Sequence, residues 1–480
     1  GWGIDRMKSM IRERADWCIS RQRRWGLPIP VFYCEDCGKP VCTDETIKAV
    51  SDLFAEKGSN AWFELDAADI LPHGFACPHC GKSAGFTKEE DTLDGWFDSG
   101  STHYASMKKD QGFWPATMYL EGLDQYRGWF QSSLLTAVGA LGEGAPFKEC
   151  VTHGWTVDGE GKAMHKSLGN GVDPADVFNE NGADILRLWA ASADYHADVR
   201  CSKEIFKQLS QNYLKFRNTC KFMLDNLLDF DPAHPTKSED MPVLDRWLIT
   251  KLNELIEKVA QSYDDYEFHI ITHAVNDFCV TTLSSFYLDI VKDRLYCEAA
   301  DSKERRSAQT ALYLTLHTLA KLFAPILVFT CDEIWLAMPH TEADDARNVV
   351  LNEMNKPFAA YSLDAETMAR WERIIEVRTA VNGALEEARA AKVIGKSLEA
   401  DVHLTVAESD TFLVDESPEA LSDLFIVSKV ELSIGDALAV KVTNAAGTKC
   451  PRCWKHSTDA NEDGLCPRCA AVMRRLPDLL

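Results

Sequence analysis

Four C-x-x-C pairs constrain this chain more than any other feature of its sequence. They hold eight of its sixteen cysteines. Two such pairs can bring four thiolates around one metal ion with tetrahedral geometry, and a site filled by four cysteines has no open position for catalysis. Disulfides would be expected in a secreted chain, but the sequence carries no recognisable secretion signal. We therefore expect two structural zinc sites in a chain from a reducing compartment.

The C-terminal set gives the more specific signal. Its spacing is two, twelve and two residues, and a proline follows the first cysteine of each pair: Cys450, Pro451, Cys453, Cys466, Pro467 and Cys469. Free buried cysteines would not need this paired arrangement. A redox C-x-x-C would be expected inside a thioredoxin-like βαβ unit, which the surrounding sequence does not predict. We expect these four cysteines to bind zinc.

The N-terminal set consists of Cys34, Cys37, Cys77 and Cys80. Its two pairs are separated by 39 residues, and each pair continues as C-x-x-C-G-K. This symmetry predicts a second zinc site, although Cys42 and His79 lie close enough in the sequence to compete. We expect His79 to lie outside the coordination shell or in solvent.

Length and periodicity divide the chain into several folding units, since 480 residues exceed one hydrophobic core. Glycine-punctuated motifs between about 91 and 200 are typical of an open α/β domain. Apolar residues then follow a helical period to about 392, and a period of two begins after Gly395. The predicted fold class is α/β plus all-α, divided as 1–200 with a metal-held insertion at 34–80, a helical domain at 201–395, a small α/β module at 396–444 and a zinc module at 445–480.

Charge and hydropathy limit the partners of the chain. The net charge of -23 argues against a nucleic-acid partner, but residues 1–26 hold seven Lys or Arg against three acids. Such a basic strip is compatible with RNA. The most apolar segment, 320–338, contains three charged residues, so we expect no membrane span and a cytoplasmic location. The start at Gly1 suggests an internal fragment.

Two polar motifs are candidates for ligand chemistry. The loop from Asp158 to Asn170 is bracketed by glycines and contains Lys162 and Lys166. Such a loop can close over phosphates, with a lysine neutralising the charge of a leaving pyrophosphate, although most loops of this composition are solvated turns.

The second motif runs from Glu121 to Phe130, directly after an apolar strand signal. Carboxylates and amides at a strand's carboxyl end suit hydrogen bonds to amino and ribose groups of a ligand. The same residues also suit a helix N-terminus, where acids favour the dipole. Trp96 and Trp129, both in glycine-flanked polar motifs, are candidates for the wall of a ligand pocket, although a lone tryptophan is usually core.

These motifs resemble those of class I aminoacyl-tRNA synthetases of the isoleucine, valine and leucine group. The stretch 16–26 resembles the family sequence after the editing insertion, and residues 96–100 read W-F-D-S-G. Residues 121–130, E-G-L-D-Q-Y-R-G-W-F, match the isoleucine branch, as does the C-P-R-C-W knuckle at 450–454. The resemblance covers essentially the whole chain.

The resemblance implies the second half of a Rossmann-like nucleotide-binding domain, followed by an anticodon-binding helical bundle and a zinc module that docks on the anticodon region. It implies a monomeric ligase that joins isoleucine to ATP, supplied as Mg-ATP, and transfers the acyl group to tRNA(Ile). The implied site residues are Glu121, Gly122, Asp124 and Gln125 for the adenylate, Trp96 and Trp129 for the amino-acid pocket, and His165 and Lys166 for pyrophosphate.

Two departures from the family pattern limit this reading. The family's K-M-S-K-S loop appears as Ala163-Met164-His165-Lys166-Ser167, so its first lysine and first serine are replaced; Lys162 could substitute in part. No H-I-G-H motif and no editing domain occur in the sequence, so we expect the isolated chain to be inactive. The alternatives are a non-catalytic tRNA-binding or zinc-scaffold protein derived from the family, or a valine- or leucine-specific sibling.

Overall fold

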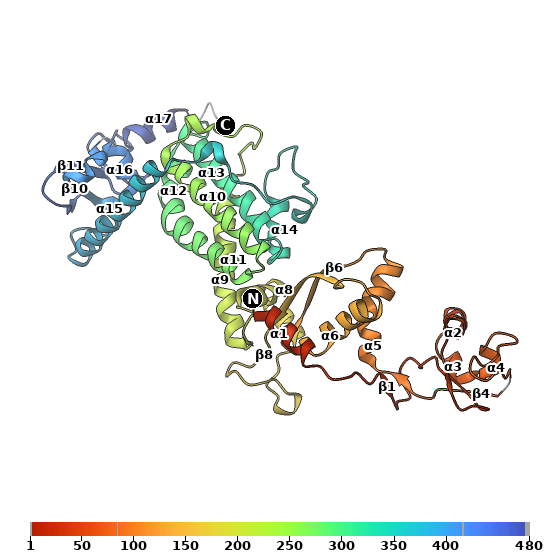
Figure 1. Ribbon diagram of the computed structural model, residues 1–480. Coiled ribbons are helices and arrows are strands. Elements are labelled where there is room, and N and C mark those ends of the chain that lie inside the picture. The colour runs from red at the N-terminus through yellow and green to blue at the C-terminus, as the bar shows by residue number, and fades with distance from the viewer. Residues whose placement is uncertain (1, 84, 415–416, 476–480) are drawn as a thin grey trace. The chain divides into compact units, whose positions relative to one another are not determined.

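The structure is a computed structural model that describes residues 2–83, 85–414 and 417–475 (Figure 1). The last five residues of the predicted zinc module, 476–480, lie outside the described residues. The chain divides into two compact units, one of residues 1–157 and 195–199, the other of residues 158–194 and 200–480. Each unit is described by itself.

A parallel strand pair organises the first unit. Strand β6 (Ala116–Gly122) pairs with β7 (Phe147–His153), with Glu121 opposite Thr152. Parallel strands need a crossover connection, which helices α6 (Trp129–Leu134) and η3 (Leu135–Ala140) supply. The remaining elements are α1 (Trp2–Arg12), β1 (Ser20–Arg21), β5 (Thr92–Leu93), α5 (Gly95–Gly100), η1 (His103–Asp110), η2 (Leu123–Tyr126), β8 (Thr156–Val157) and, across the unit boundary, β9 (Val199–Arg200).

The predicted insertion at 34–80 lies in a small subdomain of the first unit whose sheet begins at Phe32 and ends at Lys88. Its antiparallel sheet has the order β3-β2-β4, from Pro40–Val41, Phe32–Cys34 and Phe86–Lys88. Helix α2 (Asp44–Lys57) begins with a capping box in which Thr43 and Thr46 satisfy each other's backbone N–H groups. Short helices α3 (Ala61–Glu64) and α4 (Ala67–Ile70) complete a core around Phe32 and Trp62.

A helical bundle dominates the second unit, and its helices pack side by side (Figure 1). On α10 the apolar stripe Trp247, Leu248, Leu252, Leu255, Ile256 and Val259 is buried, as its spacing predicted. The helices of this unit before the α/β module are η4 (Lys166–Leu168), α7 (Pro174–Asn181), α8 (Ala183–Ser192), α9 (Lys203–Asp225), η5 (Ser238–Asp240), α10 (Val243–Asp264), α11 (Phe268–Asp277), η6 (Phe278–Tyr287), α12 (Leu288–Cys297), α13 (Lys303–Phe323), α14 (Val328–Ala337), η7 (Val349–Leu351), η8 (Ala359–Tyr361) and α15 (Ala365–Ala390).

Two side chains of α8 tie it to the bundle. The Asp184 carboxylate accepts the backbone N–H of Thr330 at 2.8 Å and that of Phe329 at 3.3 Å. It thereby caps the N-terminus of α14, where a negative charge also favours the helix dipole. Arg187 donates to the backbone carbonyls of Pro325 and Ile326 at 2.6 and 2.9 Å. Helix α8 is therefore fastened to the turn between α13 and α14.

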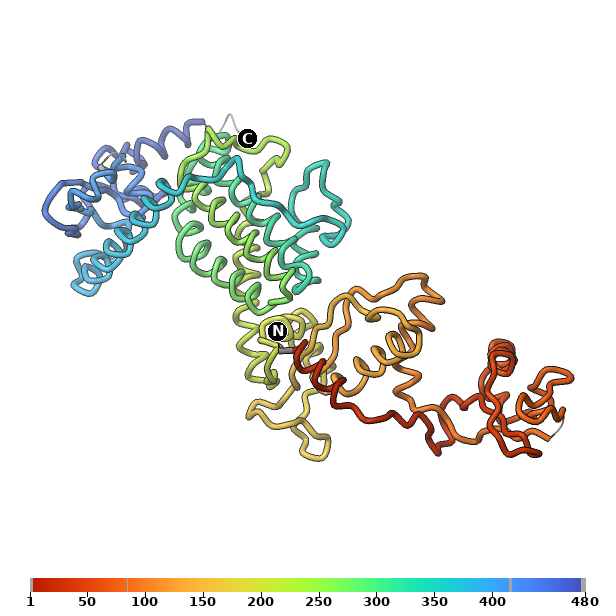
Figure 2. The backbone as a smooth tube through the Cα atoms, viewed as in Figure 1, coloured from red at the N-terminus to blue at the C-terminus, as the bar shows by residue number. Residues whose placement is uncertain are grey.

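A three-stranded α/β module follows the bundle. Its central strand β10 (Ala400–Val406) alternates buried and half-buried residues, as the period of two predicted. It runs parallel to β11 (Lys429–Ile434) and antiparallel to β12 (Ala439–Asn444). The other elements of this end are η9 (Ser397–Glu399), η10 (Glu408–Val414), α16 (Pro418–Phe425), β13 (Thr448–Lys449), β14 (His456–Ser457) and α17 (Pro467–Arg475). Figure 2 follows this course from the bundle into the last module.

None of the described helices combines the length and apolar character needed to cross a membrane.

Candidate functional site

The carboxyl end of β6 carries the first group of predicted site residues. Glu121 and Gly122 end the strand, and η2 follows with Asp124 and Gln125. The Gln125 amide donates to Oδ2 of Asp124 at 2.9 Å, and its Oε1 accepts the backbone N–H of Trp129 at 2.9 Å. Within the described residues, the half-buried Glu121 carboxylate has no hydrogen-bond partner. It is free to accept hydrogen bonds from a ligand at the strand end.

Gly128 keeps this strand end compact. A Cβ atom at this position would lie 2.4 Å from Oε1 of Gln125 and 3.1 Å from the ring of Trp96. A larger residue would push the amide or the indole away. The structure therefore brings Gln125 and Trp96 together across a glycine.

The two predicted tryptophans differ in their surroundings. The Trp129 ring stacks on Tyr119, with centroids 4.2 Å apart and planes 8° apart, and its indole N–H donates to the carbonyl of Ser99 at 2.9 Å. Trp96 has 44% of its surface exposed. Trp129 is thus fixed by contacts with β6, α5 and η2. Trp96 is more accessible to solvent.

Asp94 is a central residue of this region that the sequence analysis did not single out. Its Oδ2 accepts from the indole N–H of Trp17 and from the guanidinium of Arg21, both at 2.9 Å, and its Oδ1 caps α5. Nearby, burial and then the charge of Asp94 raise the pKa of Asp98. The contacts join residues more than 70 positions apart, so no local spacing announces them.

Part of the predicted basic strip is occupied by internal contacts. Arg21 is paired with Asp94, and Arg14 donates to Gln131 while lying over the ring of Trp17 at 5.2 Å. Arg23 and Arg24 are exposed. The part of the strip that remains available to a partner is therefore smaller than the sequence suggests.

The glycine-bracketed loop belongs to the second unit and is organised by two residues at its ends. Asp158 accepts the backbone N–H of Lys162 and, at 2.8 Å, the side-chain amide of Asn170. The Asn170 hydrogen bond is the largest cause of the lowered pKa of Asp158. Asn170 Oδ1 accepts the backbone N–H of His165 at 2.9 Å. These hydrogen bonds join the two ends of the loop and thereby restrict the conformation of the residues between them.

The two lysines of the loop are in different states. The ammonium of Lys162 lies 2.7 Å from Oε2 of Glu160, whereas the side chain of Lys166 is exposed and has no partner among the described residues. Gly169, in the left-handed conformation, ends the turn of η4 after Lys166. Lys166 is the loop lysine that is free to meet an anion.

The four cysteines of each set converge. In each set the four sulfurs lie within 4.8 Å of one another among the described residues. The sulfur-sulfur distance is 3.6 Å for Cys34–Cys80 and 3.8 Å for Cys37–Cys77. A tetrahedron with zinc-sulfur bonds of about 2.3 Å has sulfur edges of about 3.8 Å, so the spacing fits zinc. His79 instead contacts the carbonyl of Pro40 at 3.2 Å.

The C-terminal set, Cys450, Cys453, Cys466 and Cys469, has the same dimensions, with 3.7 Å between the sulfurs of Cys453 and Cys466. Burial alone would raise the pKa of Cys450, but backbone N–H groups of Cys453, Cys466 and Arg452 lower it to about 6. In the first set, burial is likewise outweighed at Cys77, where the N–H groups of His79 and Cys80 lower the pKa to about 7. One thiol of each set is therefore favoured as the thiolate that binds metal, whereas the pKa values of Cys37, Cys80, Cys453 and Cys469 are raised.

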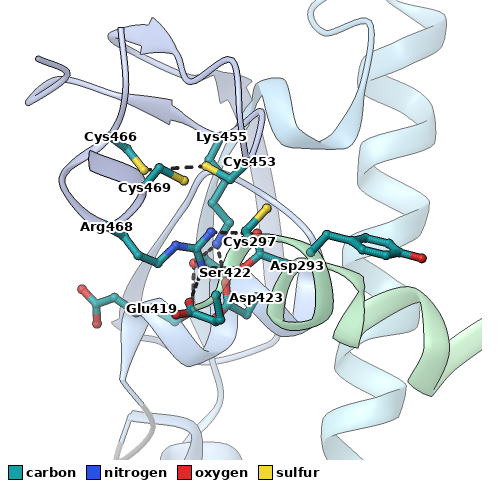
Figure 3. Close-up of polar contacts among 12 residues, drawn as sticks. Asp293, Cys297, Glu419, Ser422, Asp423, Cys453, Lys455, Cys466, Arg468 and Cys469 are labelled. Carbon is teal, nitrogen blue, oxygen red and sulfur yellow. Dashed lines mark hydrogen bonds and ion pairs between the residues drawn. The ribbon is translucent and has the colours of Figure 1, made fainter. Parts of the chain in front are cut away.

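Arginines beside the C-terminal cysteines hold the surrounding helices. Figure 3 shows the Arg468 guanidinium directed at Asp293 of α12, with Nη2 2.8 Å from Oδ1 of Asp293. Its Nη1 lies 3.2 Å from Oε1 of Glu298. Arg452 donates to the backbone carbonyl of Cys297. The Lys455 ammonium pairs with Asp423 of α16. Sequence spacing predicted the metal ligands but gave no sign of these partners.

Family models match three parts of the chain. Residues 1–202 match the class I tRNA synthetases for isoleucine, leucine, methionine and valine, residues 245–404 match the anticodon-binding domain of tRNA ligases, and residues 447–472 match a zinc finger found in FPG and IleRS. A solved leucyl-tRNA synthetase of Agrobacterium radiobacter K84, in a ternary complex with tRNA and LeuAMS, shares the fold at a TM-score of 0.54 and 19% identity, over 90% of this chain and 51% of that one.

Curated relatives give the same picture. An isoleucine-tRNA ligase of Caldanaerobacter subterraneus is 48% identical over 98% of this chain and 52% of its own length, and one of Carboxydothermus hydrogenoformans is 49% identical over 99% and 53%. The chain spans about half the length of these relatives. The order of the catalytic, anticodon-binding and zinc-finger matches is the order of the structural elements described above. The chain therefore contains, in this order, a class I tRNA synthetase domain, an anticodon-binding domain of tRNA ligases and a zinc finger of the type found in IleRS.

Proposed function

We propose that this chain is the part of an isoleucine-tRNA ligase that carries the second half of the adenylate site and the tRNA-binding body. The observation that carries the proposal is the identity of 47 to 49% with isoleucine-tRNA ligases over nearly the whole chain. The E-G-L-D-Q-Y-R-G-W-F run at the end of β6 agrees with that branch. A valine- or leucine-specific sibling is not favoured.

The proposed reaction has two steps. The carboxylate of isoleucine attacks the α-phosphorus of Mg-ATP, so that isoleucyl-AMP forms and pyrophosphate leaves. A hydroxyl of the terminal ribose of tRNA(Ile) then attacks the acyl carbon, and AMP leaves. The protein contributes by positioning the reactants and by stabilising the charge that accumulates on the phosphates.

The strand end would hold the adenylate. Glu121, which has no hydrogen-bond partner among the described residues, would accept hydrogen bonds from the amino group or ribose of the ligand, with Gly122 allowing close approach and Asp124 and Gln125 beside it. Trp129 and the more exposed Trp96 would line the amino-acid pocket. In this arrangement the Gln125–Trp129 hydrogen bond would fix the polar residues that contact the adenylate relative to the tryptophans of the amino-acid pocket.

The glycine-bracketed loop would act on the leaving group. Lys166 would place its charge near pyrophosphate, and His165 could donate a further hydrogen bond. Because Lys162 is paired with Glu160, Lys166 is the stronger candidate for this charge. The Asp158–Asn170 closure would hold both side chains in one loop conformation.

The rest of the chain would bind RNA and zinc. We retain the division into a helical anticodon-binding domain at 201–395, a junction module at 396–444 and a zinc module from 445, in a monomeric cytoplasmic enzyme. Both cysteine sets would hold zinc as a structural ion, because four thiolates leave no open coordination position. Thiolate sites of this kind suit a reducing compartment.

Lys166→Ala tests the catalytic part of the proposal. Isoleucine-dependent ATP-pyrophosphate exchange is measured with the longer polypeptide that carries this sequence, because the relatives are about twice as long. We expect the rate of adenylate formation to fall about a hundredfold, with little change in isoleucine affinity, as for loss of one transition-state contact. Lys162→Ala is the matched control and should cost much less. Equal rates for both variants and the parent would remove Lys166 from the mechanism.

Binding of tRNA tests the other part. The chain should bind tRNA(Ile) more tightly than other tRNAs, with an affinity that falls as salt rises. A protein-interaction scaffold would show no such selectivity. Equal binding of all tRNAs would therefore contradict the proposed function, whatever the outcome of the exchange assay.

A further inference from the structure

The two knuckles of the C-terminal module share a residue type that is not a metal ligand, although Nη1 of Arg452 also lies 3.7 Å from Sγ of Cys469. Each reads C-P-R-C, which places an arginine, Arg452 or Arg468, between two of the cysteines. The first cysteine set has no arginine at the matching positions, which are occupied by Asp36 and His79. The difference suggests a task specific to the second module.

Both arginines reach the same turn of the bundle. Arg452 donates to the backbone carbonyl of Cys297, and its other amino group lies 3.5 Å from the carbonyl of Tyr296. These carbonyls end α12 and have no partner within the helix, because the last four carbonyls of a helix are always left over. A cation there also meets the negative end of the helix dipole. Cys297 completes the contact by directing its thiol at the carbonyl of Arg452, 3.7 Å away.

Arg468 forms ion pairs with the acidic side chains of that turn. It makes a bidentate pair with Asp293 and a further contact of 3.2 Å with Glu298. The side chains are mostly buried, with exposed fractions of 32% for Arg468, 21% for Asp293 and 19% for Glu298. Bidentate guanidinium-carboxylate pairs specify direction as well as distance. The two arginines therefore fix the module against α12 at two points, of which Figure 3 shows the one made by Arg468.

The buried core of the module is small. The buried cluster around its cysteines consists of Cys297 and the ligands, with Leu465 partly buried beside them. Helix α17 adds only the buried Ala470 and Val472, which is little apolar surface for orienting the module by packing. Directional hydrogen bonds must supply the orientation.

We propose that Arg452 and Arg468 are positioning residues that lock the zinc module onto the C-terminal turn of α12 and so present it in the orientation that tRNA binding requires. This inference rests on the proposed function. Neither arginine contacts the RNA in this account; each acts through the module that it holds.

The test uses the zinc-loaded 480-residue chain and a tRNA(Ile) transcript. We expect Arg468→Ala to weaken tRNA(Ile) binding about tenfold while zinc content stays that of the parent chain. Arg452→Ala should weaken binding in the same direction, and Arg452→Lys, which can still donate to a carbonyl, should recover part of the loss. Arg475→Ala is the matched control. Arg475 also belongs to the zinc module and pairs with Asp301 at 2.6 Å, but this ion pair is exposed.

The acidic partners separate a clamp from direct RNA contact. If the clamp operates, Asp293→Asn with Glu298→Gln should weaken binding as much as Arg468→Ala, and combining all three changes should add less than twofold. If Arg468 instead bound a phosphate, removing its acidic neighbours would leave affinity unchanged or raise it. That result would overturn the inference.

The remaining outcomes are also decisive. Binding by Arg468→Ala within twofold of the parent would overturn the clamp, and so would loss of zinc from Arg468→Ala, since the arginine would then maintain the metal site rather than its orientation. If the parent chain itself fails to prefer tRNA(Ile), the proposed function falls and the inference with it.

Discussion

The two cysteine modules have the same ligand set but are stabilised in different ways. In the first, the sulfurs lie at the edge of a small apolar core that includes Phe32, Val50 and Trp62. In the second, the ligands themselves make up most of the buried cluster, and arginines tie it to a neighbouring helix. A four-cysteine motif therefore specifies local geometry, whereas the attachment of the module depends on residues outside the motif.

Loss of one thiolate should have the largest effect and should differ between the modules. We expect Cys469→Ser to release zinc and leave residues 447–475 without a stable fold, because metal binding supplies about 10 kcal/mol or more to such sites. Cys80→Ser should release zinc from the first module but leave its helices partly protected by the apolar core. Limited proteolysis with mass spectrometry measures both. Equal protease sensitivity of the two variants would contradict the distinction.

Removing apolar core from the first module gives the converse test. Trp62 is buried and donates its indole N–H to the carbonyl of Glu89 at 3.0 Å. Trp62→Ala should lower the free energy of unfolding of this module by about 3 to 5 kcal/mol even with zinc in excess. Hydrogen exchange of α2 amides reports the change. Phe63→Ala, at the exposed neighbouring position, should leave exchange nearly unaltered; a similar effect there would show that packing is not the cause.

The helical bundle differs from both cysteine modules because we expect its stability to depend on pH rather than on a bound metal. Burial would raise the pKa of Asp344, but hydrogen bonds from His317 and Thr341 lower it to about 2. A folded-state pKa below the ordinary value of about 3.9 means that the stabilisation is present above about pH 4 and is lost as the pH falls through 2.

Asp344→Asn should therefore destabilise the bundle by about 2 kcal/mol at pH 6 and should flatten its stability profile between pH 4 and 2. Urea unfolding followed by circular dichroism measures this, and chelators should not change it. Asp345→Asn is the control: the pKa of Asp345 is also lowered to about 2, but by the exposed Arg347, whose ion pair is screened by solvent and should matter much less. A profile as steep in Asp344→Asn as in the parent would assign the acid sensitivity elsewhere.

The smallest expected effect lies in the knuckle turns. After the second cysteine, the first module has Gly38 and Gly81 in the left-handed conformation, but the second has Trp454 with φ of 66°. Gly81→Ala should cost about 1 kcal/mol, because side chains disfavour this conformation. Trp454→Gly should gain a similar amount, reduced by loss of the Lys396 contact over its ring at 5.9 Å. Zinc-binding competition measures both, and a loss of affinity in Trp454→Gly would show that the ring contact outweighs the strain.

The sequence predicted the local features of the molecule well. The C-x-x-C spacing predicted that four cysteines of each set would meet, and the apolar stripe from Trp247 to Val259 predicted the buried face of α10. The stripe depends on geometry within one helix and each C-x-x-C pair on geometry within one turn, while the meeting of two pairs follows from the tetrahedral preference of zinc. The roles of Glu121 and Lys166 remain predictions.

Long-range side-chain contacts could not be predicted in the same way. Arg468 meets Asp293 across 175 positions, and Asp94 collects Trp17 and Arg21 from more than 70 residues upstream. Such pairs depend on how the helices and strands pack against one another in the folded protein. Charged residues of either sign are also too common for the partner of each to be identified from the sequence. Part of the predicted basic strip was consumed by these contacts.

The fastening of α8 by Asp184 and Arg187 has a mechanical consequence for the loop that carries Lys166. The loop, α7 and α8 follow one another in a single compact unit with the bundle, and α8 is pinned to the turn before α14. Under the proposed function, a displacement of the bundle on binding RNA would therefore also move α8 and the base of the loop. In this fold Lys166 belongs to the same compact unit as the bundle that we propose binds RNA.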